Sequence, residues 1–186
     1  MTTTALIVGD LQAGIVDNYP FAAGVLPVME RVVPAARASG IPVIFIRFGV
    51  RASGLDVSAG NQLISSLHGA GTLFHEESPE TLVHSRIEPL PGESVVVKRR
   101  ASAFAATDLD LLLRAQRIDS IVLTGVATGA MVAATLYDAA DRDYRVTVLS
   151  DACADEEPDV HDFLINRVFP ARGADVLTSH EWTARL

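Results

Sequence analysis

The chain has 186 residues, of which 49% are hydrophobic and 20% charged, and its formal net charge is -8. This composition is that of a globular protein, and the length suits a single domain over residues 1–186. The negative charge and the scattered Lys and Arg argue against nucleic acid or membrane as main partners, because both attract clustered cations.

Six short runs are apolar at nearly every position, which is typical of strands buried on both faces of a sheet. In chain order they cover residues 4–8, 42–48, 93–98, 120–125, 145–149 and 174–177. Four segments with helical spacing lie between them, at residues 26–39, 109–116, 130–141 and 160–168. Strands that alternate with helices predict a three-layer α/β/α fold, in which a six-stranded parallel sheet carries helices on both faces.

Two of the predicted helices have unusual features. Residues 26–39 end before Gly40, a typical C-cap, and contain Pro34, which we expect either to kink the helix or to mark a less regular turn. Residues 130–141 are apolar all round, so we expect this helix to be packed on several sides.

The segment 49–91 does not fit the alternation of strands and helices. It is long, weakly periodic and rich in Gly, Ser, His and Pro. A connection of this length is usually a functional excursion, so we expect it to pass over the active face of the sheet.

The polar residues that follow the strands are the candidates for chemistry, because an open parallel sheet binds ligands beyond the carboxyl ends of its strands. Asp10 follows the first strand and Lys98 ends the third. The fourth strand runs through residues 125–131 directly into a helix, whose N-terminus offers free N–H groups and a positive partial charge. An acid, a base and a helix N-terminus are therefore expected in one crevice.

Four stretches of the sequence carry a family resemblance over essentially the whole chain. They are ALIVGDLQ (5–12), VVVK with ASAF (95–98 and 101–104), LTGVAT with VAAT (123–128 and 132–135), and VLSDACA (148–154). In this order and at these separations, they are similar to the isochorismatase-like, or cysteine-hydrolase, superfamily. The resemblance assigns catalytic positions to Asp10 and Lys98, and it implies a cis peptide between Val126 and Ala127.

Met131 stands where the resemblance places the catalytic cysteine of most relatives. A thioether has no proton to lose, so it cannot act as the thiolate nucleophile of an acyl-enzyme mechanism. Cys153, the only thiol, falls at a position to which the resemblance assigns no nucleophile. The chain thus matches a hydrolase scaffold without its covalent route.

Three functions stay open after this substitution. The first is a hydrolase of a small molecule that uses Asp10 as general acid and base with Lys98, as isochorismatases do; the bulk of Met131 makes isochorismate itself doubtful as the substrate. The second is a family member that has lost catalysis and serves as a small-molecule-binding or oligomeric structural protein. The third is a non-hydrolytic reaction on an apolar substrate, with Met131 as pocket wall.

Six further residues are candidates for substrate binding because of their places near these strand ends. Thr128 is also a candidate N-cap for the following helix. The full set is Gln12, Phe48, Phe104, Val126, Ala127 and Thr128.

The sequence predicts no metal ion and no cofactor. Residues 49–91 contain Asp56, His68, His75 and His84, but not the tight local spacing of a zinc site. Phosphate-binding glycine motifs are also missing.

The expected location is the cytoplasm, and the expected assembly is a homo-oligomer. No apolar run approaches a bilayer span, the N-terminus lacks the basic segment of a signal peptide, and a lone cysteine suits a reducing compartment. Relatives are commonly dimers or tetramers, which is the assembly that the resemblance implies here.

Overall fold

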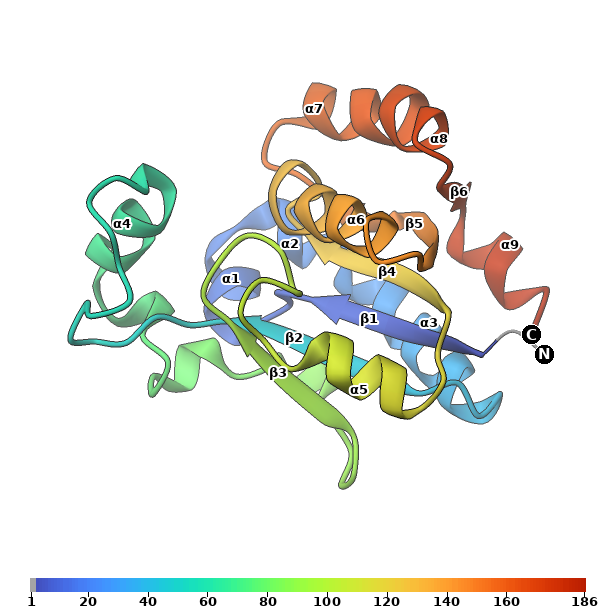
Figure 1. Ribbon diagram of the computed structural model, residues 1–186, viewed down its shortest axis with the longest axis horizontal. Coiled ribbons are helices and arrows are strands. Elements are labelled where there is room, and N and C mark those ends of the chain that lie inside the picture. Colours follow the sequence, from blue (N-terminus) through green and yellow to red (C-terminus); the bar gives the residue numbers. More distant parts are fainter. Residues whose placement is uncertain (1–2) are drawn as a thin grey trace.

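The computed structural model describes residues 3–186, within which six strands form one parallel sheet (Figure 1). The order across the sheet is β3-β2-β1-β4-β5-β6. The strands are β1 (Thr4–Gly9), β2 (Val43–Phe48), β3 (Ser94–Lys98), β4 (Ser120–Val126), β5 (Arg145–Ala154) and β6 (Asp175–Leu177). The prediction of a six-stranded parallel sheet is confirmed.

Helices cover both faces of the sheet, as predicted. One face carries α1 (Ala13–Asn18), α2 (Pro20–Ala23), α3 (Leu26–Ala38) and α9 (Ser179–Thr183). The other carries α5 (Leu109–Ala115), η4 (Thr128–Val132), α6 (Ala133–Ala140), α7 (Pro158–Phe163), η5 (Leu164–Val168) and α8 (Phe169–Ala171).

Strand β1 shows why the strand segments are apolar at every position. Ala5 and Ile7 belong to the core under α5 and α6, whereas Leu6 and Val8 belong to the core under α3. Successive side chains of a strand point to opposite faces, so a strand covered on both faces needs apolar residues throughout.

Helix α3 runs without interruption through Pro34. Two expectations about single elements need correction. Strand β5 continues past Leu149, because its last residues pair again with β4 after a register shift between Leu123 and Gly125. The segment predicted at 130–141 begins with the π-helical turn η4, and Tyr137 on α6 is 43% exposed, so one side of this helix faces solvent.

The long segment after β2 holds helix α4 (Gln62–Gly69) and the short 3-10 helices η1 (Gly71–Phe74), η2 (Pro79–Thr81) and η3 (Ser85–Ile87). Two backbone hydrogen bonds close its first part: the Val50 N–H donates to the Phe74 oxygen, and the Glu76 N–H donates to the Val50 oxygen, both at 2.9 Å. Residues 51–74 therefore form a lobe, called here the α4 lobe, which stands out from the end of β2 in Figure 1.

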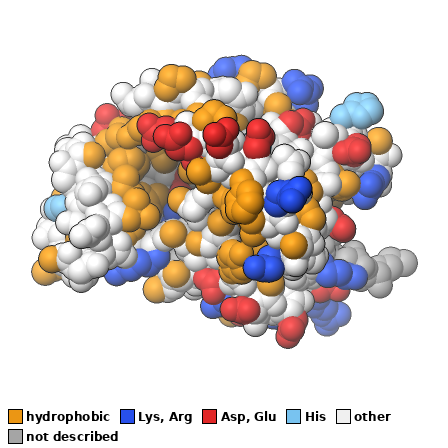
Figure 2. Space-filling view, turned by 90° about the horizontal axis from the view of Figure 1, so that it is seen from above, with side chains coloured by type: hydrophobic (Ala, Val, Ile, Leu, Met, Phe, Trp, Pro, Cys, Tyr) orange, Lys and Arg blue, Asp and Glu red, His pale blue; other side chains and the backbone are white. Residues whose placement is uncertain are grey.

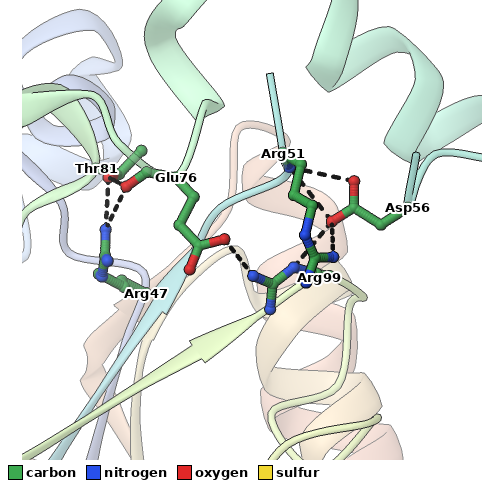
Figure 3. A network of polar contacts seen from close by, with 6 residues as sticks. All are labelled: Arg47, Arg51, Asp56, Glu76, Thr81 and Arg99. Carbon is green, nitrogen blue, oxygen red and sulfur yellow. Dashed lines mark hydrogen bonds and ion pairs between the residues drawn. The ribbon is translucent and has the colours of Figure 1, made fainter. Parts of the chain in front are cut away.

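A network of ion pairs ties the α4 lobe to the end of β3 (Figure 3). The Arg99 side chain places Nε 2.8 Å from the Asp56 carboxylate and also contacts the Glu76 carboxylate. Burial raises the pKa of Asp56, but a backbone hydrogen bond from Arg51 and the charges of Arg51 and Arg99 outweigh it and hold that pKa below its ordinary value. Asp56 thus stays ionised at neutral pH and keeps the lobe attached.

Strands β1 and β4 approach each other closely where both end. Gly9 pairs with Gly125, and a Cβ atom on Gly125 would lie 2.0 Å from the Gly9 oxygen. Gly125 also has φ 115, a conformation that side chains disfavour. This contact sets the spacing of the two strand ends that border the candidate site.

Gly125→Ala is expected to lower the free energy of unfolding by roughly 3 kcal/mol or more, because both the conformation and the backbone of β1 oppose a side chain. Urea denaturation measures the change. Gly40→Ala is the control, since Gly40 also has positive φ but nothing within 4 Å, and it should cost only about 1–2 kcal/mol. Equal losses in the two variants would contradict the role given to the strand contact.

Candidate active site

Asp10 and Lys98 meet at the carboxyl end of the sheet. Asp10 follows β1, Lys98 ends β3, and β2 lies between the two strands. Lys98 reaches across the end of β2 and places Nζ 2.8 Å from Oδ2 of Asp10. The side chains are only 3% and 9% exposed, so this is a buried ion pair.

The Lys98 ammonium group has partners on several sides. Besides Asp10, it donates to the Arg100 backbone oxygen at 3.1 Å. It also lies 5.0 Å from the centre of the Phe48 ring, which is a cation–π distance. These contacts hold the charge of Lys98 at one place beside Asp10.

The second carboxylate oxygen of Asp10 has no such partner. Oδ1 is buried and finds no hydrogen bond among residues 3–186. Burial raises the pKa of Asp10 above its ordinary value of 3.8, against the opposing charge and hydrogen bond of Lys98. Asp10 therefore holds a proton more readily than an exposed carboxyl group does.

A cavity of ≈ 270 Å³ opens in front of the pair. Its walls are mostly apolar, and they come from both faces of the sheet and from the α4 lobe. Figure 2 shows a hollow lined by hydrophobic side chains on this face, with acidic side chains along its edge. The lining residues are Asp10, Ile15, Tyr19, Phe21, Phe48, Leu63, Ile64, Leu67, Phe74, Lys98, Arg100, Ala101, Val126, Ala127, Ala130, Met131 and Glu156.

Met131 lies in the wall of the cavity and does not plug it. Its side chain is 1% exposed and packs against Gly9 in the core under α6. The Thr135 hydroxyl lies 3.5 Å from the Met131 sulfur and donates to it. The Met131 thioether thus lies over Gly9, and the cavity beside it stays open.

The loop between β4 and η4 has the expected conformation. The peptide bond between Val126 and Ala127 is cis, and both residues line the cavity. The Gly129 N–H donates to the Asp155 carboxylate at 2.6 Å, which ties this helix start to the segment after β5.

Three of the predicted binding residues lie outside the cavity wall. Gln12 is fully buried, and its amide donates to the Phe48 oxygen at 2.9 Å and accepts from the Phe48 N–H at 2.5 Å. Phe104 stacks on Tyr144 in the core, with ring centres 5.7 Å apart. Thr128 is buried and lies 2.8 Å from Nδ1 of His161, while Ala127 takes the N-cap position. Each of these three side chains contacts another part of the fold and does not reach the cavity.

Sequence reasoning missed the apolar residues that the helices bring to the cavity. The α4 lobe supplies Leu63, Ile64 and Leu67, whose spacing on one helix face was a detectable signal. Tyr19 and Phe21 flank the start of α2, and nothing in their spacing pointed to the cavity.

Cys153 lies away from this wall. It is buried in the core under α6, and burial raises the pKa of its thiol to about 12. Cys153 therefore stays protonated at neutral pH and is not the missing nucleophile.

Within residues 3–186, no three His, Cys, Asp or Glu side chains come together as a metal-binding group. No helix of this range is long and apolar enough to cross a membrane.

Comparisons with known proteins find relatives over most of the chain. The chain is 31% identical over 144 residues to N-carbamoylsarcosine amidase of Arthrobacter sp, covering 73% of this chain and 52% of the amidase, so it spans about half the length of that enzyme. It is 31% identical over 189 residues to a probable inactive nicotinamidase of Arabidopsis thaliana, covering 98% of this chain and 96% of that protein.

A solved structure and a family model agree on the fold. The crystal structure of a cysteine hydrolase from Pseudomonas syringae pv. phaseolicola 1448A matches with a TM-score of 0.90 at 27% identity, covering 98% of this chain and 91% of that one. The model of the isochorismatase domain matches residues 4–181. The chain therefore belongs to the isochorismatase family.

Proposed function

We propose that this protein hydrolyses a small molecule without a cysteine nucleophile, with Asp10 as general acid and base beside Lys98. The observation that carries the proposal is Oδ1 of Asp10, which is buried at an accessible cavity and has no hydrogen-bond partner among residues 3–186. A buried polar atom without a partner costs free energy, so it is suited to receive a donor from a bound ligand.

The raised pKa of Asp10 supports its role as an acid. A protonated Asp10 donates its proton to the substrate, for instance to the enol carbon of a vinyl ether, and water attacks the oxocarbenium carbon that results. The Asp10 carboxylate then takes a proton from the attacking water, which returns the group to its starting state. Lys98 stabilises the carboxylate in the second half of this cycle.

The absence of a reactive thiol supports a route without an acyl-enzyme. Met131 has no proton to lose, and Cys153 lies in the core with its thiol protonated. The apolar wall favours a substrate with a largely uncharged body.

A second candidate function is ligand binding without turnover, within an oligomeric or structural role. Met131 at the nucleophile position favours it, and so does the similarity to a plant protein described as a probable inactive nicotinamidase. Exposed apolar side chains such as Leu111 and Phe163 support the accompanying prediction of a dimer or tetramer.

Turnover of a panel of small amides and isochorismate separates the two functions. Asp10→Asn is expected to lower kcat/KM by about 10²–10⁴-fold, because an amide cannot supply the proton. Asp175→Asn, an exposed change on β6, is the control and should leave the rate unchanged. A folded wild-type protein that turns over no member of the panel would contradict the hydrolase and favour the binding function.

The pH dependence of kcat/KM tests the acid role. The rate should be constant at low pH and fall as pH rises through the pKa of Asp10, which burial places above 3.8. Lys98→Met removes the nearby charge that lowers this pKa, so the fall should move to higher pH. A fall that moves to lower pH would rule out Asp10 as the acid.

The stability of Lys98→Met tests the ion pair independently of turnover. Removing Lys98 leaves the Asp10 carboxylate buried without a cation, and at neutral pH this should cost roughly 3–5 kcal/mol. Because the raised pKa favours the protonated folded form, the loss should shrink as pH falls through that pKa and grow as pH rises. Urea denaturation at several pH values measures it, and the double variant Asp10→Asn/Lys98→Met should show no such pH dependence.

A further inference from the structure

Gly9 is the one position in the buried part of β1 that lacks a side chain. Ala5 and Ile7 point to the face of the sheet under α6, and by alternation residue 9 continues that row. Glycine at the end of β1 packs no side chain of its own, and on folding it loses more conformational freedom than other residues do. A compensating contact is therefore expected at this place.

Met131 supplies that contact from the neighbouring helix. A Cβ atom on Gly9 would lie 1.7 Å from Cε and 2.7 Å from Sδ of Met131. The methyl group of Met131 thus occupies the place that a side chain of residue 9 would need. A side chain at residue 9 and the Met131 side chain therefore cannot both fit on this face of the strand.

The surroundings of Met131 leave one direction free. Thr135 holds the sulfur through its hydroxyl, the Thr124 backbone oxygen lies 3.2 Å from the same Cβ position, and Val132 and Leu136 share the core cluster. The unfilled volume that Met131 borders is the cavity in front of Asp10. A side chain at residue 9 would therefore push the thioether toward Asp10.

We propose that Gly9 and Met131 form one specificity-determining unit that keeps the cavity in front of Asp10 open to a small, mainly apolar ligand with a hydrogen-bond donor. This inference rests on the ligand site of the proposed function, but not on turnover. Gly9 takes up the bulk of Met131, so the methionine lines the cavity as a wall.

The size and lining of the cavity define the ligand class. An engineered apolar cavity of about 150 Å³ takes up a benzene molecule, so ≈ 270 Å³ holds a single ring with a short substituent. Apolar side chains from β2, α2 and the α4 lobe surround the ring, and the donor group pairs with Oδ1 of Asp10. Phenol has both features and serves as the probe.

Methyl NMR on protein labelled with ¹³C-methyl methionine reports on this unit directly. The chain has 3 methionines, and Met29 lies fully buried in the core on the opposite face of the sheet. Phenol should shift the Met131 methyl resonance of the wild type and leave the Met29 resonance in place. No shift of Met131 up to the solubility limit of phenol would overturn the inference.

Gly9→Ala and Gly9→Ala/Met131→Ala separate the role of the methionine from that of the strand. Gly9→Ala should move the Met131 resonance without any ligand and weaken phenol binding at least tenfold. The double variant removes the displaced thioether and should restore binding to within a few-fold of the wild type. If phenol still binds weakly to the double variant, the inference is overturned, because the loss of affinity then comes from distortion of β1.

Circular dichroism and urea denaturation extend the test to variants that fold poorly. If Gly9→Ala fails to fold while the double variant folds, the coupling of the two residues is supported. If neither folds, residue 9 must be glycine for the sake of the strand itself, and the inference is overturned. Turnover does not enter these readouts, so a protein that binds phenol as described but hydrolyses nothing contradicts only the proposed hydrolase function.

Discussion

The buried ion pair between Asp10 and Lys98 is the constraint on which the site depends. Two opposite charges taken out of water are tolerated only when they satisfy each other, so Asp10 and Lys98 must stay together. The parallel sheet brings them within reach because all its strands end at one edge, and the Phe48 ring lies beside the ammonium group. One oxygen of Asp10 finds no hydrogen-bond partner among residues 3–186, and the proposed ligand site is built on this oxygen.

The α4 lobe turns this strand edge into a cavity. Backbone hydrogen bonds to Val50 close the base of the lobe. Arg99, the residue after Lys98, forms an ion pair with Asp56 of the lobe. Lys98 and Arg99 are adjacent, so one short stretch of chain both places the ammonium group in the site and anchors the α4 lobe that forms the cavity wall. The lobe contributes apolar side chains only, so the cavity has a polar end at Asp10 and an apolar body.

The Met131 thioether offers no nucleophilic thiol, and the cavity beside it stays open. Its side chain lies over Gly9, where the strand leaves room for it, and the remaining thiol, Cys153, is held protonated in the core. The lack of a thiol at residue 131 and the open cavity thus involve two residues far apart in the chain, Met131 and Gly9. A cavity that persists beside a buried acid is consistent with acid–base chemistry and with simple ligand binding.

The sequence by itself determined the sheet, the places of Asp10 and Lys98, and the absence of a nucleophilic thiol at residue 131. These depend on local patterns, since an apolar run marks a buried strand and a polar residue after it marks the active edge. Only the tertiary structure decided that the side chains of Gln12, Phe104 and Thr128 make contacts outside the cavity. It also decided that Leu63 and Leu67 reach the cavity. Their places depend on which distant groups they meet, and that information is not contained in the spacing of residues along the chain. The position of Met131 over Gly9 has the same cause, because packing between two elements decides where a flexible side chain lies.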